Sequence, residues 1–186
     1  MERAKERLAI VVPITLVTII LLLFLNFRNM TEVLIIMGTL PTALIGGVWL
    51  LYLLGYHMSV AVVVGFIALA GVAVEIGVIM LVYLKQALAS EKLKARKEQR
   101  VLNSQDIATA VTNGALLRVR PIMMTVTAII AGLLPIMLGS GTGSEVMRRI
   151  AAPMVGGMIS ATLLTLALIP AVFLLWQRSG LRKNPQ

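Results

Sequence analysis

Five long apolar stretches constrain the fold of this chain more than any other feature of its sequence. They lie at residues 8–27, 33–54, 58–84, 121–139 and 150–176. A helix needs about 20 apolar residues to cross the roughly 30 Å of hydrocarbon in a bilayer, and each stretch is close to or beyond that length. With 59% hydrophobic and 13% charged residues, the chain is also far more apolar than an ordinary soluble domain. The sequence therefore predicts an all-α integral membrane protein with five transmembrane helices.

The basic residues predict how these helices are oriented. If the chain crosses the membrane five times, twelve of its 17 Lys and Arg residues lie on one side, in segments 28–32, 85–120 and 177–186, and five lie on the other. Lys and Arg accumulate on the cytoplasmic side of membrane proteins. We therefore expect the N-terminus outside the cytoplasm and the C-terminus in it. The net charge of +9 does not indicate a nucleic-acid partner, because no aromatic residues are interleaved with the basic ones.

The same boundaries predict the organisation of the chain. The charged start is expected to be an outer-side junction to further sequence, and the long polar segment a pair of basic surface helices, the second capped by Ser104, that lie against anionic lipid headgroups. The predicted parts are the junction at 1–7, helices one to three at 8–84, the basic cytoplasmic segment at 85–120, helices four and five at 121–176, and a cytoplasmic tail at 177–186.

Prolines and small residues predict local features of the helices. Pro41 lies inside a span and is expected to kink it, whereas Pro121 and Pro153 are expected in first helical turns, where proline is tolerated. Small residues four apart, as in Ala128-x-x-x-Gly132 and Ala152-x-x-x-Gly156, let helix backbones approach closely. These features favour a packed bundle over separate membrane anchors.

The composition excludes most enzymatic chemistry. The chain has no cysteine and a single histidine, His57, and no HExxH motif or acid pair accompanies it, so no ligand set for a catalytic zinc is present. We expect neither an enzyme nor a bound cofactor. Most of the 11 methionines are expected to fill gaps in the core, but thioethers also suit Cu(I), and Met147 stands out because it is expected at the outer mouth of the bundle.

One carboxylate interrupts the third apolar stretch, in the sequence GVAVEIGVIML. Glu75 lies nine residues from the end of this stretch, or roughly 14 Å along a helix, which is close to mid-membrane. A carboxylate at that depth is expected to face the bundle interior and to be protonated or paired. It is either a proton-relay group or a protonated glutamate that hydrogen-bonds a neighbouring helix. The spans hold no second acid, so a relay needs partners outside this chain.

Three long segments carry a resemblance to a known family. They are FLNFRNMTEVLIIMGTLPTALIGGVWL, GFIALAGVAVEIGVIML, and the stretch from RVRPIMMTVTAIIAGLLPIMLGSGTGSEVMRRIAAPMVGGM to IPAVF. Over residues 2–178 the chain closely resembles the C-terminal membrane half of heavy-metal efflux pumps of the resistance-nodulation-division (RND) superfamily. GVAVE, SEVM and AAPMVGGM resemble the copper/silver, CusA-like branch more than the divalent-cation branch.

The resemblance implies helices eight to twelve of a twelve-helix inner-membrane transporter that exchanges protons for Cu(I) or Ag(I). It also implies a homotrimer that joins a periplasmic adaptor and an outer-membrane channel, and it implies the remaining N-terminal part of the pump as a partner. By position, Glu75 matches a proton-relay glutamate and Met147 a methionine near the periplasmic end of the metal path. Ile122 replaces a lysine of the same relay. Two alternatives stay open: a fragment of a zinc, cobalt or nickel pump, and a stand-alone five-helix membrane protein that binds a partner.

Overall fold

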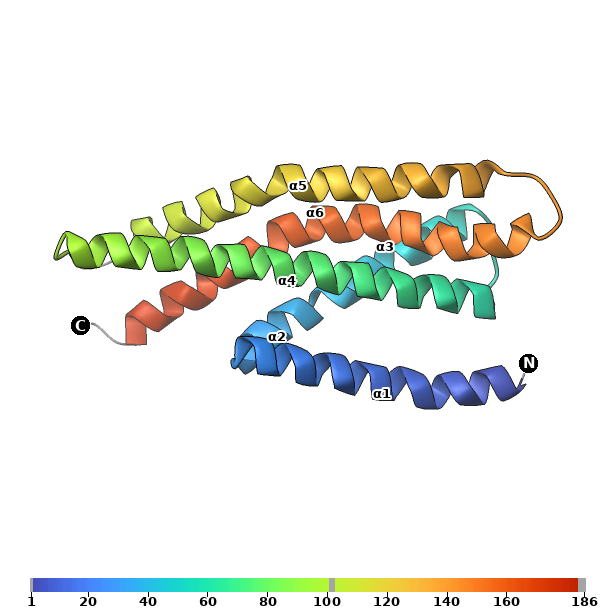
Figure 1. Ribbon diagram of the computed structural model, residues 1–186, viewed down its shortest axis with the longest axis horizontal. Helices are drawn as coiled ribbons and strands as arrows, with labels where there is room; N and C mark the ends of the chain where they lie inside the picture. Colours follow the sequence, from blue (N-terminus) through green and yellow to red (C-terminus); the bar gives the residue numbers. More distant parts are fainter. Residues whose placement is uncertain (1, 101–102, 184–186) are drawn as a thin grey trace. The chain divides into compact units, whose positions relative to one another are not determined.

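The computed structural model describes the backbone of residues 2–100 and 103–183, and within these it leaves out the side chains of 2–6, 8 and 178–183. Most side chains of the predicted junction (1–7) and tail (177–186) therefore lie outside the described residues. Across the described ranges the chain is helical, without strands, and five segments are long and apolar enough to cross a membrane, as predicted. The helices are α1 (Glu2–Phe27), α2 (Met30–Met37), α3 (Thr39–Leu53), α4 (Val60–Lys97), α5 (Ser104–Leu138) and α6 (Ser144–Lys183) (Figure 1).

The chain forms two units, Met1–Ile35 and Ile36–Gln186. The first unit consists of α1 and most of α2. Helix α1 ends at Phe27, and Arg28 takes a left-handed backbone conformation, with φ of 52°, while its N–H still donates to the Phe24 carbonyl at 2.7 Å. This arginine therefore terminates the first span, and α2 begins two residues later.

The second predicted span is divided at Gly38 into α2 and α3. Pro41 was expected to kink this span, but the helix is divided three residues earlier. Pro41 lies in the first turn of α3, where its missing N–H costs no helical hydrogen bond. Two hydroxyls bond carbonyls beside the division: Thr39 Oγ1 donates to Ile36 O at 2.7 Å, and Thr42 Oγ1 donates to Thr39 O at 2.7 Å. These bonds satisfy backbone acceptors without water.

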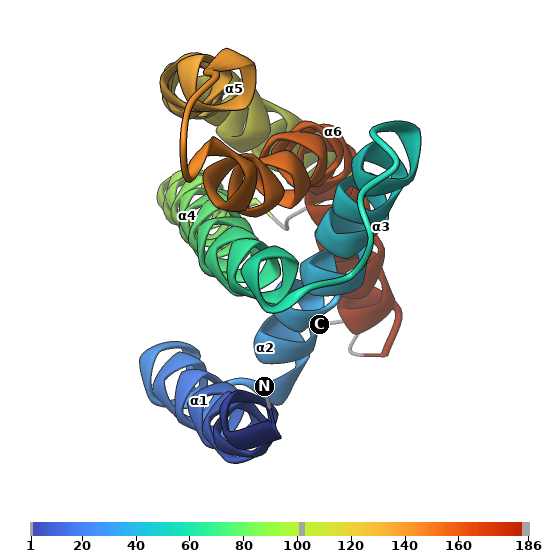
Figure 2. The same cartoon turned by 90° about the vertical axis from the view of Figure 1, so that its right-hand side faces the viewer.

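The second unit is organised around α6. This helix packs against α3, α4 and α5, and the end-on view shows it between them (Figure 2). At the crossing with α3 the two backbones nearly touch, since a Cβ added to Gly156 would lie 2.5 Å from the carbonyl oxygen of Gly46. Ser160 Oγ completes the crossing by donating to Thr42 O at 3.2 Å. The predicted small-residue contact at Ala152-x-x-x-Gly156 is thus confirmed, whereas nothing lies within 4 Å of a Cβ at Gly132.

Helices α4 and α5 are much longer than a bilayer requires. The 38 residues of α4 span about 57 Å, against roughly 30 Å of hydrocarbon. The prediction of a separate pair of surface helices at 85–120 is wrong, because residues 85–97 continue α4 and residues 104–120 are the first part of α5. The reason is local: no glycine or proline follows Gly77 until Gly114, so nothing stops α4 before Gln99, whose φ is 50°.

Three further details of the sequence-based boundaries are corrected by the structure. The cap of α5 is Asn103, not Ser104, and it forms a capping box with Asp106. Pro121 and Pro153 lie inside α5 and α6 rather than in first turns, since both helices begin well before their apolar segments. The polar residues 104–120 and the apolar residues 121–138 thus belong to one helix, α5.

We expect Gly156→Ala to lower the free energy of unfolding of the chain by about 1–3 kcal/mol, the usual cost of overpacking. The added methyl would meet the Gly46 carbonyl oxygen and Leu50 Cβ, each at 2.5 Å. The measurement is unfolding of the purified protein by circular dichroism. Gly132→Ala is the matched control, and it should leave stability unchanged or raise it, because its methyl meets open space. Equal stability of the two variants would contradict the close crossing.

Candidate functional site

The first candidate residue, Glu75, lies at the middle of the apolar part of α4. The buried face of this helix is formed by its neighbours: Ala73 and Ile76 are buried, and a Cβ on Gly77 would lie 3.5 Å from Thr39 Oγ1 of α3. Glu75 is on a different face and is exposed. Within this chain Glu75 is therefore not among the residues through which α4 packs, because small and apolar residues occupy those positions.

Glu75 instead lines a small hollow between α4 and α5, with a volume of about 60 Å³. This is room for a few water molecules. Apart from Glu75, Arg118 and the Thr125 hydroxyl, the walls are apolar. The lining residues are Val72, Glu75, Ile76 and Ile79 from α4, and Arg118, Pro121, Ile122, Thr125, Val126 and Ile129 from α5. Glu75 and Arg118 are thus the two charged residues of a lining that is otherwise mostly apolar.

Arg118 is the cation of this hollow. Its guanidinium carbon lies 4.4 Å from the centre of the Tyr83 ring, a cation–π contact that holds the side chain along α4. Its Nε is buried and has no hydrogen-bond partner among the residues that the structure describes. A buried donor without a partner costs free energy, so this N–H is available to water or to a further acceptor. No ion pair of 4 Å or less joins Arg118 to Glu75 in the described part of the chain.

The position of Arg118 bears on the substitution at Ile122. Ile122, where the resemblance leads one to expect a lysine, is buried and lines the same hollow. Arg118 is one helical turn earlier on the same face of α5, so the lining of the hollow still includes a basic residue. Sequence analysis missed this residue because it assigned Arg118 to a polar cytoplasmic segment. The i, i+4, i+8 spacing of Arg118, Ile122 and Val126 could have revealed it, had α5 been taken as continuous.

The second candidate residue, Met147, lies in a different hollow. It is 52% exposed in the first turns of α6 and lines an open space of about 500 Å³ together with the loop at 139–143. Arg148 Nε donates to the Gly139 carbonyl at 2.9 Å and so ties this loop to α6. The described residues contain no group of three or more His, Cys, Asp or Glu side chains that could hold a metal ion. A thioether with nearby hydroxyls and carbonyls offers a weak, soft contact rather than a closed site.

The other methionines divide by burial. Met158 is fully buried and fills the core of the second unit, as expected of a gap-filling residue. Met123 and Met124 are exposed on α5. The structure does not bring any of these three into the hollow that Met147 lines.

Comparison with known proteins identifies the family. A protein-family model described as the AcrB/AcrD/AcrF family matches residues 1–177. The chain belongs to this family. The relatives include the "Putative cation efflux system protein SilA" of Salmonella typhimurium, 54% identical over 179 residues, which are 96% of this chain and 17% of SilA. The "Cation efflux system protein CusA" of Escherichia coli K12 is 52% identical over 185 residues, 98% of this chain and 18% of CusA.

A solved structure agrees with the sequence comparison. The crystal structure of a heavy metal efflux pump superposes with a TM-score of 0.78 and 39% identity, over 95% of this chain and 16% of the pump. The predicted resemblance to RND heavy-metal efflux pumps is confirmed, and so is the all-α membrane fold. A relative named for cobalt, zinc and cadmium resistance is more distant, at 38% identity over 178 residues. The chain spans less than a fifth of the length of these AcrB/AcrD/AcrF-family relatives.

Proposed function

We propose that this chain forms the proton-translocating part of a heavy-metal efflux pump, in which Glu75 carries the proton. One observation supports this most directly: Glu75 and Arg118 line one hollow of water-holding size between two helices that are long enough to span a membrane. An ionisable residue in such a place is costly, and it usually marks an ion or proton path. The rest of the pump supplies the helices and the metal-binding region that this chain does not contain.

The chemistry proposed for the hollow uses one titrating group and one fixed charge. Glu75 can exist as a neutral acid or as a carboxylate. Arg118 is the basic residue in the lining of the same hollow. When Glu75 takes up a proton, the negative charge in the lining between α4 and α5 is neutralised. Alternation between these two states is how proton uptake changes the contact between α4 and α5 in the proposed pump.

The proposed setting follows from the basic residues and from the family. The N-terminus is periplasmic and the C-terminus cytoplasmic, in an inner membrane, because twelve of the 17 Lys and Arg residues then lie in the cytoplasm. The pump is a homotrimer that works with a periplasmic adaptor and an outer-membrane channel, like the efflux systems that the chain resembles. Met147 then lies at the periplasmic end, where its thioether is a stepping contact for the metal ion.

The proposed substrate is Cu(I) or Ag(I). Greater identity to CusA and SilA than to the cobalt-zinc-cadmium relative supports this choice. Ile122 is the one observation that favours the divalent alternative, since the copper/silver pattern has a lysine there. Metal tolerance of cells that carry the pump separates the two: resistance to silver and copper supports the first, and resistance to zinc, cobalt or nickel alone the second.

In the pump that contains this chain, we expect Glu75→Gln to abolish proton-coupled efflux, because the amide keeps the size of the side chain but cannot release a proton. The measurement is silver tolerance in cells without another exporter, together with proton flux in proteoliposomes. Glu145→Gln is the matched control, since Glu145 lies in the first turn of α6, outside the hollow, and should retain both activities. Full transport by Glu75→Gln would disprove the relay.

We expect Arg118→Leu to reduce the transport rate by about 10- to 100-fold, because it removes the charged group whose buried Nε–H is available to water or to a further acceptor. Arg118→Lys should recover much of the rate, because it restores the positive charge. Ile122→Lys in the Arg118→Leu background should also restore transport if the hollow needs one cation and not a particular residue. If Arg118→Leu transports at the normal rate, the cation has no role.

Met147→Leu should raise the silver concentration for half-maximal transport by about 10-fold or more, because the pump loses a soft ligand at nearly constant volume. Proton flux without metal should not change. Met124→Leu is the control and should transport normally, because Met124 is also exposed but lies outside this hollow. An unchanged half-maximal concentration for Met147→Leu would remove Met147 from the metal path.

A further inference from the structure

All five tryptophan and tyrosine residues of the chain lie near the ends of the predicted spans, and none lies in the middle of one. Trp49, Tyr52 and Tyr56 are in the last turns of the second span or in the outer turn that follows it, and Tyr83 and Trp176 are at the inner ends of the third and fifth spans. The rings of Trp and Tyr are amphipathic, and they accumulate where hydrocarbon meets headgroups. These residues therefore mark an outer and an inner membrane boundary.

The two boundaries are about one hydrocarbon thickness apart. Leu51, which lies between Trp49 and Tyr52 in the sequence, packs in one buried cluster with Val62 of α4. Val62 and Tyr83 are 21 residues apart, which is about 32 Å along the helix. The hydrocarbon core of a bilayer is roughly 30 Å thick. The outer and the inner rings can therefore lie at its two surfaces at the same time.

Trp176 lies at nearly the same level as Tyr83. A Cβ added to Gly77 would lie 3.6 Å from Ile169 Cδ1, so these two residues are side by side on α4 and α6. The two helices run in the same direction (Figure 1), and Tyr83 and Trp176 follow six and seven residues later. The inner boundary is thus marked on two neighbouring helices.

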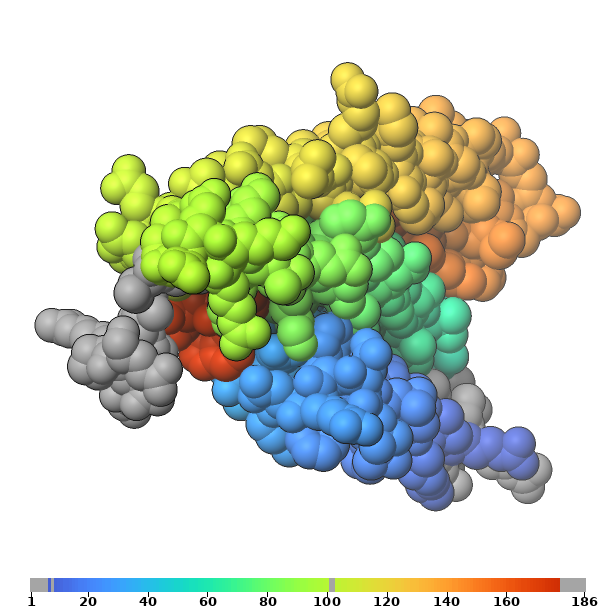
Figure 3. Space-filling model, turned by 60° about the vertical axis from the view of Figure 1, so that its left-hand side comes forward, coloured from blue at the N-terminus to red at the C-terminus, as the bar shows by residue number. Residues whose placement is uncertain are grey.

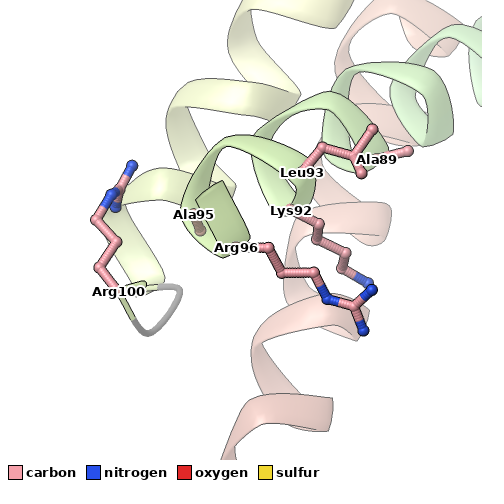
Figure 4. A pocket seen from close by; sticks show the side chains of 6 residues that line it. All are labelled: Ala89, Lys92, Leu93, Ala95, Arg96 and Arg100. Carbon is pink, nitrogen blue, oxygen red and sulfur yellow. The ribbon is translucent and has the colours of Figure 1, made fainter. Parts of the chain in front are cut away.

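The charged end of α4 lies outside this inner boundary. Lys92 and Arg96 are nine and 13 residues after Tyr83, or about 14 and 20 Å farther along the helix. The headgroup layer adds only about 5–8 Å to each side of the hydrocarbon. This part of α4, in lime green, projects at the front of Figure 3, and Figure 4 shows the long side chains of Lys92 and Arg96 extended from it. Between Val62 and Tyr83, by contrast, Glu75 is the one charged residue of α4.

At the outer boundary, the exposed side of α3 is an apolar stripe. Its residues recur three and four positions apart, so they share one face of the helix: Ile45, Val48, Trp49 and Tyr52. Trp49 is 62% exposed and Tyr52 79%, and their rings meet edge to face with centroids 6.5 Å apart. Because both rings are exposed, the indole N–H and the phenol O–H are open to water and to headgroups. An apolar stripe that ends in two amphipathic rings matches the change from hydrocarbon to headgroups at a membrane surface.

The stripe lacks the small residues through which membrane helices pack closely on one another. On α3 those residues face the rest of the bundle. A Cβ added to Gly46 would lie 2.5 Å from Gly156 O of α6, and one added to Gly47 would lie 2.6 Å from Phe66 Cε1 of α4. The close-packing side of α3 is therefore occupied within this chain. In the end-on view α3 and α5 lie on opposite sides of α6 (Figure 2), so protein that covers Glu75 need not cover the stripe.

We propose that the stripe contacts phospholipids of the outer leaflet in the complete polypeptide, with acyl chains against Ile45 and Val48 and the rings of Trp49 and Tyr52 at the headgroups. Helix α3 is then a lipid-facing edge of the transporter, and the further protein packs on the side of α4 and α5. The proposal needs only that α3 and α4 span a membrane. It does not depend on the transport proposed above, so a failure of either proposal leaves the other intact.

The experiment measures tryptophan fluorescence in the full natural polypeptide that contains residues 1–186, with phenylalanine in place of every tryptophan except Trp49. Nanodiscs are made from phosphatidylcholine that carries bromine, a quencher, either near the headgroup or near the ends of the acyl chains. We expect Trp49 to be quenched, and about twofold or more strongly by the bromine near the headgroup. Phe66→Trp as the sole tryptophan is the matched control, because position 66 is at the same depth but packs against the buried cluster, and both lipids should quench it less.

A photo-crosslinking residue at position 48 gives a second readout, which leaves every tryptophan in place. We expect it to label phospholipid. Label found on another segment of the polypeptide, or on a second copy of it, would overturn the proposal, since protein and not lipid would then cover the stripe. Quenching of Trp49 as weak as that at position 66 would overturn it for the same reason. Stronger quenching of Trp49 by the bromine at the chain ends would equally overturn it, because the ring would then lie deep in the hydrocarbon.

Discussion

The close approach of α3 and α6 is the contact on which the second unit depends. Helices in a bilayer gain little from burying apolar surface, because lipid is as apolar as leucine, so close backbone packing and hydrogen bonds must hold them together. Gly46 and Gly156 allow this packing, and the Ser160 hydroxyl adds a hydrogen bond to Thr42 O across the crossing. Because α6 also packs against α4 and α5, the crossing fixes the helix that positions both walls of the candidate site.

The same packing decides where Glu75 lies. Helix α4 packs through small and apolar positions, among them Leu69, Ala73, Gly77 and Met80, and these leave no room for a carboxylate. Glu75 is consequently turned to the side of α4 that faces the hollow shared with α5. An exposed carboxylate at mid-helix would be unstable against lipid, which is a physical reason to expect further protein beside it. The relatives are more than five times longer than this chain, so each has further segments besides the matched one.

Sequence reasoning predicted the features that depend on composition and missed those that depend on helix continuity. Five spans, the isolated Glu75 and the small residues around Gly156 could all be found, because hydrophobicity, charge and side-chain size are local properties. The face of α4 on which Glu75 lies could not be predicted, because the cost of burying a carboxylate does not show which neighbouring helix covers it. Arg118 was missed for a related reason: a basic segment was read as separate surface helices, although no residue in it breaks α4 before Gln99 or α5 after Asn103.

In the proposed pump, the isoleucine at position 122, where the resemblance implies a lysine, limits how protons pass through this chain. A lysine in a hollow can release its proton and take part in a relay, whereas an arginine keeps its proton at any physiological pH. With Ile122 on one turn of α5 and Arg118 on the previous turn, the basic residue in the lining is an arginine, where the resemblance implies a lysine. Tyr83 and the walls around the guanidinium hold that charge in place. In the proposed pump, Glu75 is therefore the one carrier that this chain offers within the described hollow, and the next carrier must come from the protein that packs against its exposed side.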